Sequence, residues 1–168
     1  IELKESNEKI FADFSSQNRN KIRKAEKAGV TIEYDTQCNR FSEFVSIYLE
    51  NMKRLQVAKM YYFSPAFFEG LKSLAKTSGI LINAIEDGNV IGSTVFLKGK
   101  TFGHYFLSSA TEKGRSHAVS NLMLHHGILW AKENGLHSLH LGGGVSAEES
   151  DPLLVFKKNF SEKTIKFF

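Results

Sequence analysis

Residues 80–142 constrain the fold of this chain more than any other part of the sequence. They contain three strand-like segments, ILINAIE, VIGSTVFLK and TFGHYFLSS, joined by the short turns Asp87-Gly88-Asn89 and Lys98-Gly99-Lys100. Short turns that contain glycine are typical of antiparallel hairpins. A long helical pattern, SHAVSNLMLHHGILWAKENG, and another strand-like segment, LHSLHLG, follow directly. The sequence therefore predicts an antiparallel meander, a long crossover helix and a further strand.

Helical patterns dominate the residues before this stretch. SSQNRNKIRKAEKAGV has Ser15 and Ser16 as cap residues and Gly29 as its stop, and the short strand TIEYD follows. RFSEFVSIYLENMKRL has helical spacing, and SPAFFEGLKSLAKTSG begins with Ser64 and Pro65. After LHSLHLG, a helix in DPLLVFKKNF and a strand in KTIKFF predict a C-terminal strand-helix-strand. The predicted class is mixed α/β (α+β).

The composition fits one globular domain. The chain has 168 residues, of which 42% are hydrophobic, so it can bury a sizeable core. No apolar run reaches the length of a membrane span, and the N-terminus shows no signal-peptide pattern. A single cysteine, Cys38, excludes an internal disulfide and favours a reducing compartment, so we expect a cytoplasmic protein. The net charge of +4 indicates only a mild attraction to anions.

The loop SSATEKGRSHAVSN, between the meander and the long helix, is the first candidate site. Its residues Lys113, Gly114, Arg115 and Ser116 place positive charge and a flexible backbone just before a helix N-terminus. The free N–H groups and the dipole of a helix N-terminus suit an anion such as phosphate. The alternative is a solvated turn in which Ser116 is an ordinary helix cap.

Three consecutive glycines form the second candidate site, in the segment LHLGGGVSAEESDPLLVFKKNF. Gly142, Gly143 and Gly144 follow a strand, at the end of the sheet where ligands of open α/β proteins usually bind. Glycines let a backbone approach another molecule closely or adopt a positive φ. We expect them to line a substrate cleft, and the alternative is a mobile connecting loop.

The helix after the glycines carries two adjacent lysines with different expected environments. At about 100° per residue, Leu153, Phe156 and Phe160 share one face of this helix. Lys158 falls opposite that face, whereas Lys157 flanks it and can reach inward toward a cleft. The alternative for Lys157 is a surface lysine whose stem covers apolar groups.

The histidines and the cysteine predict no metal site and no nucleophile. No pair has zinc-type spacing, and each of His104, His117, His137 and His140 stands alone in the sequence or on a different side of its strand. Cys38 has no identifiable activating partner, and no GxSxG segment is present. We therefore predict no bound metal.

The segments NRNKIRKAEKAGVTIE, YLENMKRL, YYFSPAFFEGL and LHLGGG…DPLLVFKKNFS resemble the FemABX-like proteins. These are the peptidoglycan-bridge aminoacyltransferases, which are built from domains of the GNAT (acetyltransferase-like) fold. The resemblance covers nearly the whole chain, and the order of its helices and strands also matches a GNAT-like mixed sheet. It extends to the broad GNAT/FemAB-like acetyltransferase branch that is often associated with envelope or exopolysaccharide genes.

The resemblance implies an acyltransferase in which an amine of a cell-envelope precursor attacks an activated ester or thioester. Fem enzymes take the acyl group from aminoacyl-tRNA and ordinary GNAT enzymes from acetyl-CoA, so both donors stay open and no tightly bound cofactor is expected. The motif assigns Lys157, beside Phe156, the stabilisation of charge at the reacting ester. The resemblance further implies that Tyr105 contacts the acceptor, and GNAT enzymes hold the pyrophosphate of coenzyme A at the place of residues 113–116.

The chain begins at Ile1 and has about half the length of a two-domain Fem protein. We therefore expect residues 1–168 to be a single GNAT-like domain, the C-terminal part of a longer protein with an N-terminal GNAT-like partner domain. The helical arm that Fem proteins use near tRNA is not visible. Two further functions stay open: an acetyl-CoA-dependent N-acetyltransferase, and a non-catalytic half-domain that binds an acceptor or a partner.

Overall fold

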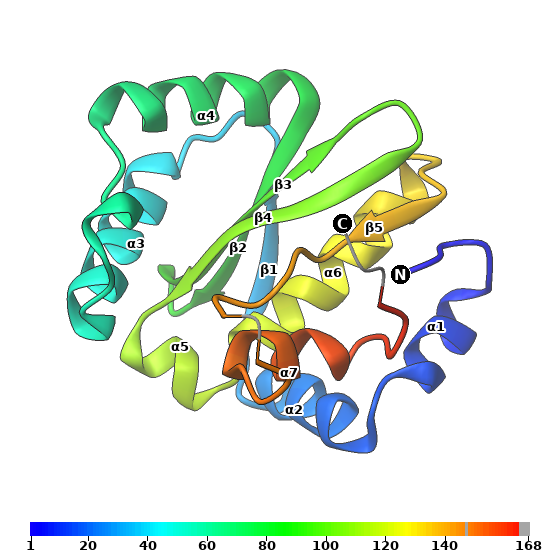
Figure 1. Cartoon of the computed structure of the whole chain (residues 1–168). Coiled ribbons are helices and arrows are strands. Elements are labelled where there is room, and N and C mark those ends of the chain that lie inside the picture. Colours follow the sequence, from blue (N-terminus) through cyan, green and yellow to red (C-terminus); the bar gives the residue numbers. More distant parts are fainter. Residues whose placement is uncertain (147, 165–168) are drawn as a thin grey trace.

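The computed structural model describes residues 1–146 and 148–164 (Figure 1). A mixed five-stranded sheet lies at the centre, in the order β1-β2-β3-β4-β5. The strands are β1 Thr31–Asp35, β2 Gly79–Glu86, β3 Asn89–Lys98, β4 Phe102–Ala110 and β5 Ser138–His140. The helices are α1 Asn7–Asp13, α2 Ser16–Lys27, α3 Phe41–Leu55, the 3₁₀ turn η1 Lys59–Tyr61, α4 Pro65–Ser78, α5 Glu112–Ser116, α6 Val119–Glu133 and α7 Pro152–Lys158.

The predicted meander and crossover are both confirmed. β2, β3 and β4 pair antiparallel, and the turn between β2 and β3 has Asp87 and Gly88 at φ +50° and +78°, as tight hairpins require. β4 and β5 pair in parallel, with α6 as the crossover between them. The predicted final strand KTIKFF falls on residues 163–168, of which 165–168 lie outside the described residues; Lys163 and Thr164 belong to no strand.

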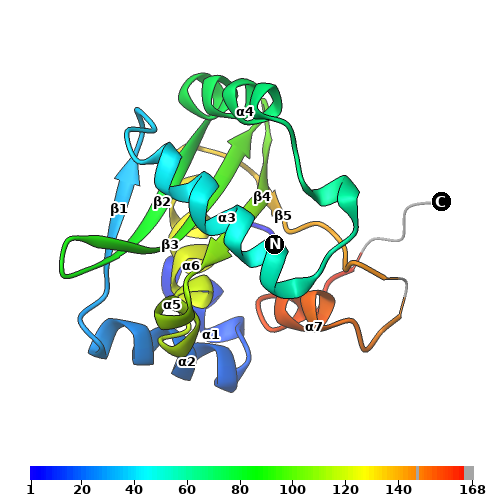
Figure 2. The same ribbon diagram turned by 90° about the vertical axis from the view of Figure 1, so that its left-hand side faces the viewer.

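Helices cover both faces of the sheet (Figures 1 and 2). α3 and α4 pack on one face, where an apolar cluster forms around Phe44, Tyr48, Phe68 and Val95. α6 packs on the other face, with α2 against it, around a larger core that includes the fully buried Phe96. The sheet thus separates two cores, and side chains that alternate along a strand point into different ones.

β4 and β5 remain paired over only a short distance. The pairs are Phe102 with Ser138, Gly103 with Leu139, and His104 with His140. Beyond His104, β4 has no strand partner on this side in the part of the chain that the structure describes. A bulge at Phe106, where the register with β3 shifts, bends β4 at the same level. We call the point where the two strands part, at His104 and His140, the β4–β5 fork.

The N-terminal residues close the outer edge of β5. The amide of Leu3 donates to the carbonyl of His137, and the amide of Leu139 donates to the carbonyl of Ile1, both at 2.9 Å. The fork therefore opens within the sheet rather than at its outer edge. Within residues 1–146 and 148–164, no helix combines the length and the hydropathy that crossing a membrane would need.

Candidate active site

α7 places one of its two lysines inside the molecule. Its start is fixed by Asp151, whose carboxylate accepts hydrogen bonds from the amides of Leu153 and Leu154 at 2.9 and 3.0 Å. Phe156 packs against the larger core, so Lys157 is turned inward and is 9% exposed. Lys158 is half-buried. Leu153 differs from its predicted environment, because it is 37% exposed.

The Lys157 ammonium lies beside the fork. Its Nζ donates to the carbonyl oxygen of Gly143 at 2.7 Å and lies 5.9 Å from the centre of the Tyr105 ring. Burial lowers the pKa of Lys157, and the charge of Asp151 opposes this shift. Tyr105 is buried against Phe96, and burial raises the pKa of its hydroxyl to about 12. At neutral pH, Tyr105 is therefore an uncharged ring beneath a fixed ammonium group.

The three glycines make room mainly for side chains of the chain itself. Gly142 has φ +76°, and a Cβ there would lie 3.2 Å from the Nζ of Lys157. At Gly144 a Cβ would lie 2.6 Å from the Oδ1 of Asp151, closer than real Cβ atoms come. Nothing lies within 4 Å of a Cβ at Gly143, whose carbonyl holds Lys157. The glycines thus shape the site, and their contact with a substrate stays a prediction.

Asp151 ties the loop after the glycines to α7. Besides capping α7, its carboxylate accepts from the amides of Val145 and Ser146 at 3.0 and 2.9 Å and from the Ser146 hydroxyl at 3.2 Å. These hydrogen bonds, above all those from the amides of Leu154 and Ser146, lower the pKa of Asp151 to about 2. The loop and the helix that carries Lys157 are therefore held by one ionised side chain.

This arrangement predicts an acid-sensitive contribution to stability. Because the folded pKa of Asp151, about 2, lies below its ordinary value of 3.8, its stabilisation is complete above pH 3.8 and is lost as the pH falls toward 2. We expect Asp151→Asn to melt at a lower temperature than wild type near neutral pH. Thermal melts across the acid range should show this gap narrowing toward pH 2, and a gap that is constant with pH would contradict the assignment.

The predicted anion loop forms the short helix α5, capped by the Thr111 hydroxyl. The Lys113 ammonium forms an ion pair with Glu86, and the Arg115 guanidinium donates to the Ala110 carbonyl at 2.7 Å. Arg115 also donates to the Oδ1 of Asn51 at 3.1 Å, and the buried Asn51 donates to the same Ala110 carbonyl. These two cations therefore tie α5 to the sheet and to α3.

One feature next to α5 suits an anion, namely the N-terminus of α6. Gly114 is buried against β3, and the Ser116 hydroxyl bonds to the Lys113 carbonyl instead of capping the next helix. α6 begins after Ala118, at φ +58°, with no side-chain cap. The structure thus brings residues 113–116 next to the uncapped N-terminus of α6. A hollow of about 560 Å³ lies beside α5, lined by Glu50 of α3 and by Thr111, Glu112, Lys113 and Ser116.

The structure brings together two histidines that stand far apart in the sequence. His104 and His140 are register partners at the fork, with their Nδ1 atoms 3.2 Å apart and their rings nearly parallel. Predicting that TFGHYFLSS and LHSLHLG pair in parallel would have been the way to predict this contact from the sequence. In the described part of the chain, no group of three or more His, Cys, Asp or Glu side chains could hold a metal ion.

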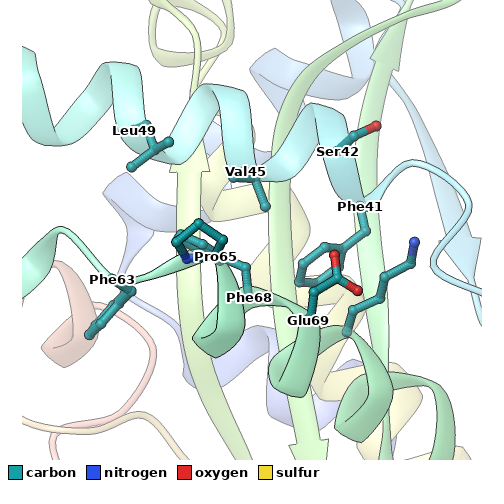
Figure 3. Close-up of a pocket in the computed structure, with 9 residues that line it drawn as sticks. Phe41, Ser42, Val45, Leu49, Phe63, Pro65, Phe68 and Glu69 are labelled. Atoms are coloured by element: carbon teal, nitrogen blue, oxygen red, sulfur yellow. The ribbon is translucent and has the colours of Figure 1, made fainter.

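A separate apolar groove lies between α3 and α4 (Figure 3). Figure 3 shows Val45 and Leu49 of α3 facing Pro65 and Phe68 of α4, with Phe63 on the connecting segment. The groove has a volume of about 430 Å³. Phe106 of β4 packs against the same apolar cluster, and its ring contacts that of His104. The groove and the His104 side chain therefore lie on the same face of the sheet.

Several solved structures share this fold. FemX has a TM-score of 0.81 at 14% identity, and the match covers 95% of this chain and 56% of the FemX chain. An aminoglycoside acetyltransferase from an uncultured soil metagenomic sample, in complex with sisomicin, has a TM-score of 0.59 at 12% identity, covering 83% and 94%. A GNAT family acetyltransferase from Elizabethkingia anophelis with acetyl-CoA bound has a TM-score of 0.55 at 21% identity, covering 77% and 73%.

The family follows from the sequence itself. A comparison with curated proteins finds no match. Residues 12–151, however, match the acetyltransferase (GNAT) domain, and this range is well over half of the 168 residues. The meander, the α6 crossover and the diverging strands β4 and β5 agree with that assignment. The chain belongs to the acetyltransferase (GNAT) domain family and is an acyltransferase domain of the FemABX-like type of fold.

Proposed function

We propose that this domain transfers an acyl or aminoacyl group onto an amine of a cell-envelope precursor, with the reaction at the β4–β5 fork. The observation that carries the proposal is the buried ammonium of Lys157, fixed by the Gly143 carbonyl beside the open edge of β4. A positive charge held in place before the reaction stabilises an oxyanion without reorganisation. Acyl transfer needs such a group, because its tetrahedral intermediate carries an oxyanion.

Each named residue has a defined part in this proposal. Lys157 has three N–H donors, of which Gly143 takes one, so others are available to the oxyanion. Phe156 anchors α7 in the core and so sets the position of Lys157. Tyr105 supports the ammonium with its ring, and its contact with the acceptor stays a prediction. Gly142 and Gly144 keep the space in which Lys157 and Asp151 sit.

The Fem-like interpretation is supported by the fold comparison. The TM-score with FemX is 0.81, against 0.59 and 0.55 for the two acetyltransferases. The chain spans 56% of the FemX chain, and a second GNAT-like domain in the whole protein stays a prediction. The same proposal includes a cytoplasmic reaction. Aminoacyl-tRNA is then the donor.

A specific observation favours a second donor, acetyl-CoA. The first N–H groups of α6 lack a side-chain cap and lie beside α5, in the position that suits a pyrophosphate. The Elizabethkingia anophelis acetyltransferase of the same fold has acetyl-CoA bound. An acetyl-CoA-dependent N-acetyltransferase is therefore the second candidate function.

Calorimetry with acetyl-CoA, coenzyme A and a mixture of aminoacyl-tRNAs separates these functions. We expect the aminoacyl-tRNA mixture to bind, and binding of acetyl-CoA alone would favour the second candidate. Ser120→Pro removes an N–H from the first turn of α6, where proline is tolerated, whereas Ser120→Ala keeps it. If the donor phosphate lies at α6, Ser120→Pro weakens binding about tenfold or more and Ser120→Ala does not. Failure of all three ligands to bind would contradict both and favour a non-catalytic binding domain.

A further inference from the structure

His104 and His140 form a hydrogen-bonded pair at the β4–β5 fork. Their ring centres are 5.2 Å apart, their planes differ by 18°, and their Nδ1 atoms are 3.2 Å apart. Both side chains are half-buried and come from the last paired position of the two strands. The pairing of β4 with β5 therefore fixes the two rings relative to each other.

The hydrogen bonds define which nitrogen of each ring carries a proton. The amide of Gly142 donates to the Nδ1 of His140 at 3.2 Å, so this Nδ1 is an acceptor and carries no proton. In its contact with the same atom, the Nδ1 of His104 must then be the donor. A neutral His104 with a proton on Nδ1 has an unprotonated Nε2. The pair thus leaves a basic nitrogen on His104.

The His104 ring and the ammonium of Lys157 both lie next to Gly142. A Cβ at Gly142 would lie 3.2 Å from the Nζ of Lys157 and 3.9 Å from the Cε1 of His104. Cε1 is bonded to both ring nitrogens, so Nε2 lies one bond beyond the atom that is nearest to Gly142. His104 contacts Phe106 and so lies on the face of the sheet that carries the α3–α4 groove. A reacting carbonyl at the fork would have Lys157 and His104 on its two sides.

We propose that the Nε2 of His104 accepts the proton of the attacking amine, while His140 positions His104 through the Nδ1–Nδ1 hydrogen bond. This inference rests on the proposed acyl transfer and adds a second group to it. The amine enters from the face that carries the α3–α4 groove. His104 is the catalytic residue in this step, and His140 is a positioning residue.

The surroundings of His104 keep it in the basic form. Burial lowers the pKa of His104 from its ordinary value of 6.5, and the positive charge of Lys157 lowers it further. The titratable groups that face it are His140 from β5, Lys157 from α7 and the neutral Tyr105 next to it on β4. At pH 7 the imidazole is therefore neutral and ready to accept a proton.

The proposed step conserves atoms and charge. The amine nitrogen forms a bond to the acyl carbon, and the carbonyl electron pair moves onto oxygen, which faces Lys157. As the C–N bond forms, a proton passes from the amine nitrogen to the Nε2 of His104. The resulting imidazolium keeps its Nδ1 proton, which stays hydrogen-bonded to the Nδ1 of His140. When the intermediate collapses, the bond to the ester oxygen or thioester sulfur breaks. The leaving group takes the proton from His104, which returns to its neutral form.

The first test needs no substrate. In ¹⁵N-labelled wild-type protein at pH 7, imidazole NMR should show the Nδ1–H tautomer for His104 and the Nε2–H tautomer for His140. The signals of His104 are assigned from their loss in His104→Asn. On acidification, His104 should become protonated below pH 6.5. An Nε2–H tautomer of His104, or a cationic His104 at pH 7, would overturn the proposal.

The second test measures transfer to Nα-acetyl-lysine amide, with a mixture of aminoacyl-tRNAs and acetyl-CoA as donors. In His104→Asn, the side-chain amide still donates to His140 but cannot accept the proton. We expect kcat to fall about 10²–10⁴-fold. Protonation of the lysine amine lowers kcat/KM in both proteins as the pH falls, but the additional, steeper loss of wild-type kcat/KM below pH 6.5 should be absent from the variant. His137→Asn, at an exposed histidine just before β5, serves as the control and should match wild type.

The outcomes separate this inference from the proposed function. If wild type transfers the acyl group, and His104→Asn does so with the same rate and pH profile, only the catalytic role of His104 is overturned. The proposed function then stands. A variant that only melts earlier, with an unchanged pH profile, would have the same consequence. If wild type transfers neither the aminoacyl nor the acetyl group, the proposed function is wrong, and the catalytic role of His104 is overturned with it.

Discussion

Replacing Lys157 with methionine is expected to lower kcat about 10²–10³-fold while the chain stays folded. Methionine keeps the length and the apolar stem of lysine but loses the ammonium that the Gly143 carbonyl holds at 2.7 Å. Lys157 is 9% exposed, and exchange of a buried charge for an apolar group of similar volume is often neutral for stability. Steady-state kinetics with each donor, together with a thermal melt, measures both effects.

Lys158→Met provides the matched control. It changes the same residue type on the same helix, at a half-buried position whose ammonium has no hydrogen-bond or ion-pair partner within the described residues. It should therefore leave kcat within about twofold of wild type, because a surface charge contributes little to a fixed site. Equal losses in the two variants would show that the total charge of α7, and not the placed ammonium, supports turnover.

Most of the fold could be predicted because its signals are local. The turns at Asp87-Gly88 and Gly99 and the alternating segments around them were sufficient to give the meander, and Gly135 correctly marked the end of the long helix. The short helix α1 was not predicted. It depends on the Ser6 cap and on burial of Ile10 in the larger core, and this packing partner is remote in sequence.

Part of the site could also be predicted, from the geometry of a single helix. The helical projection correctly separated Lys157 from Lys158, because the angle between neighbouring residues of a helix is fixed. The same projection failed for Leu153, which is exposed because α7 touches the core mainly through its second half. The partners of Gly142 and Gly144 are Lys157 and Asp151, and only the fold shows how close they come.

The contact between His104 and His140 could not be predicted from the sequence. The two residues are 36 positions apart, and neither has a local partner that suggests chemistry. Their contact requires that β4 and β5 pair in parallel with one particular register. A shift of one residue would have turned one of the two rings to the opposite face. Register between distant strands is set by packing across the whole sheet, and no local pattern encodes it.

Gly114→Ala is expected to damage both the stability of the domain and the donor site. A Cβ at this position would lie 2.0 Å from the carbonyl oxygen of Ile91 on β3. The obstacle is backbone, so no side-chain rotation relieves it, and α5 has to move away from the sheet. The same oxygen accepts from the amide and the hydroxyl of Thr111 at 3.0 and 3.1 Å, and both hydrogen bonds would be weakened. We expect a loss of about 2–4 kcal/mol in the free energy of unfolding, measured in urea.

The donor should bind more weakly to the same variant, because α5 leads directly into the N-terminus of α6. Calorimetry with acetyl-CoA and a mixture of aminoacyl-tRNAs should show the Kd of the donor that binds wild type raised about tenfold or more. Gly70→Ala is the control, since Gly70 is also helical and a Cβ there meets nothing within 4 Å. It should leave the Kd unchanged and raise stability by up to about 1 kcal/mol, because alanine favours a helix more than glycine does. If Gly114→Ala behaved like Gly70→Ala, the contact between α5 and β3 could not be what positions the donor site.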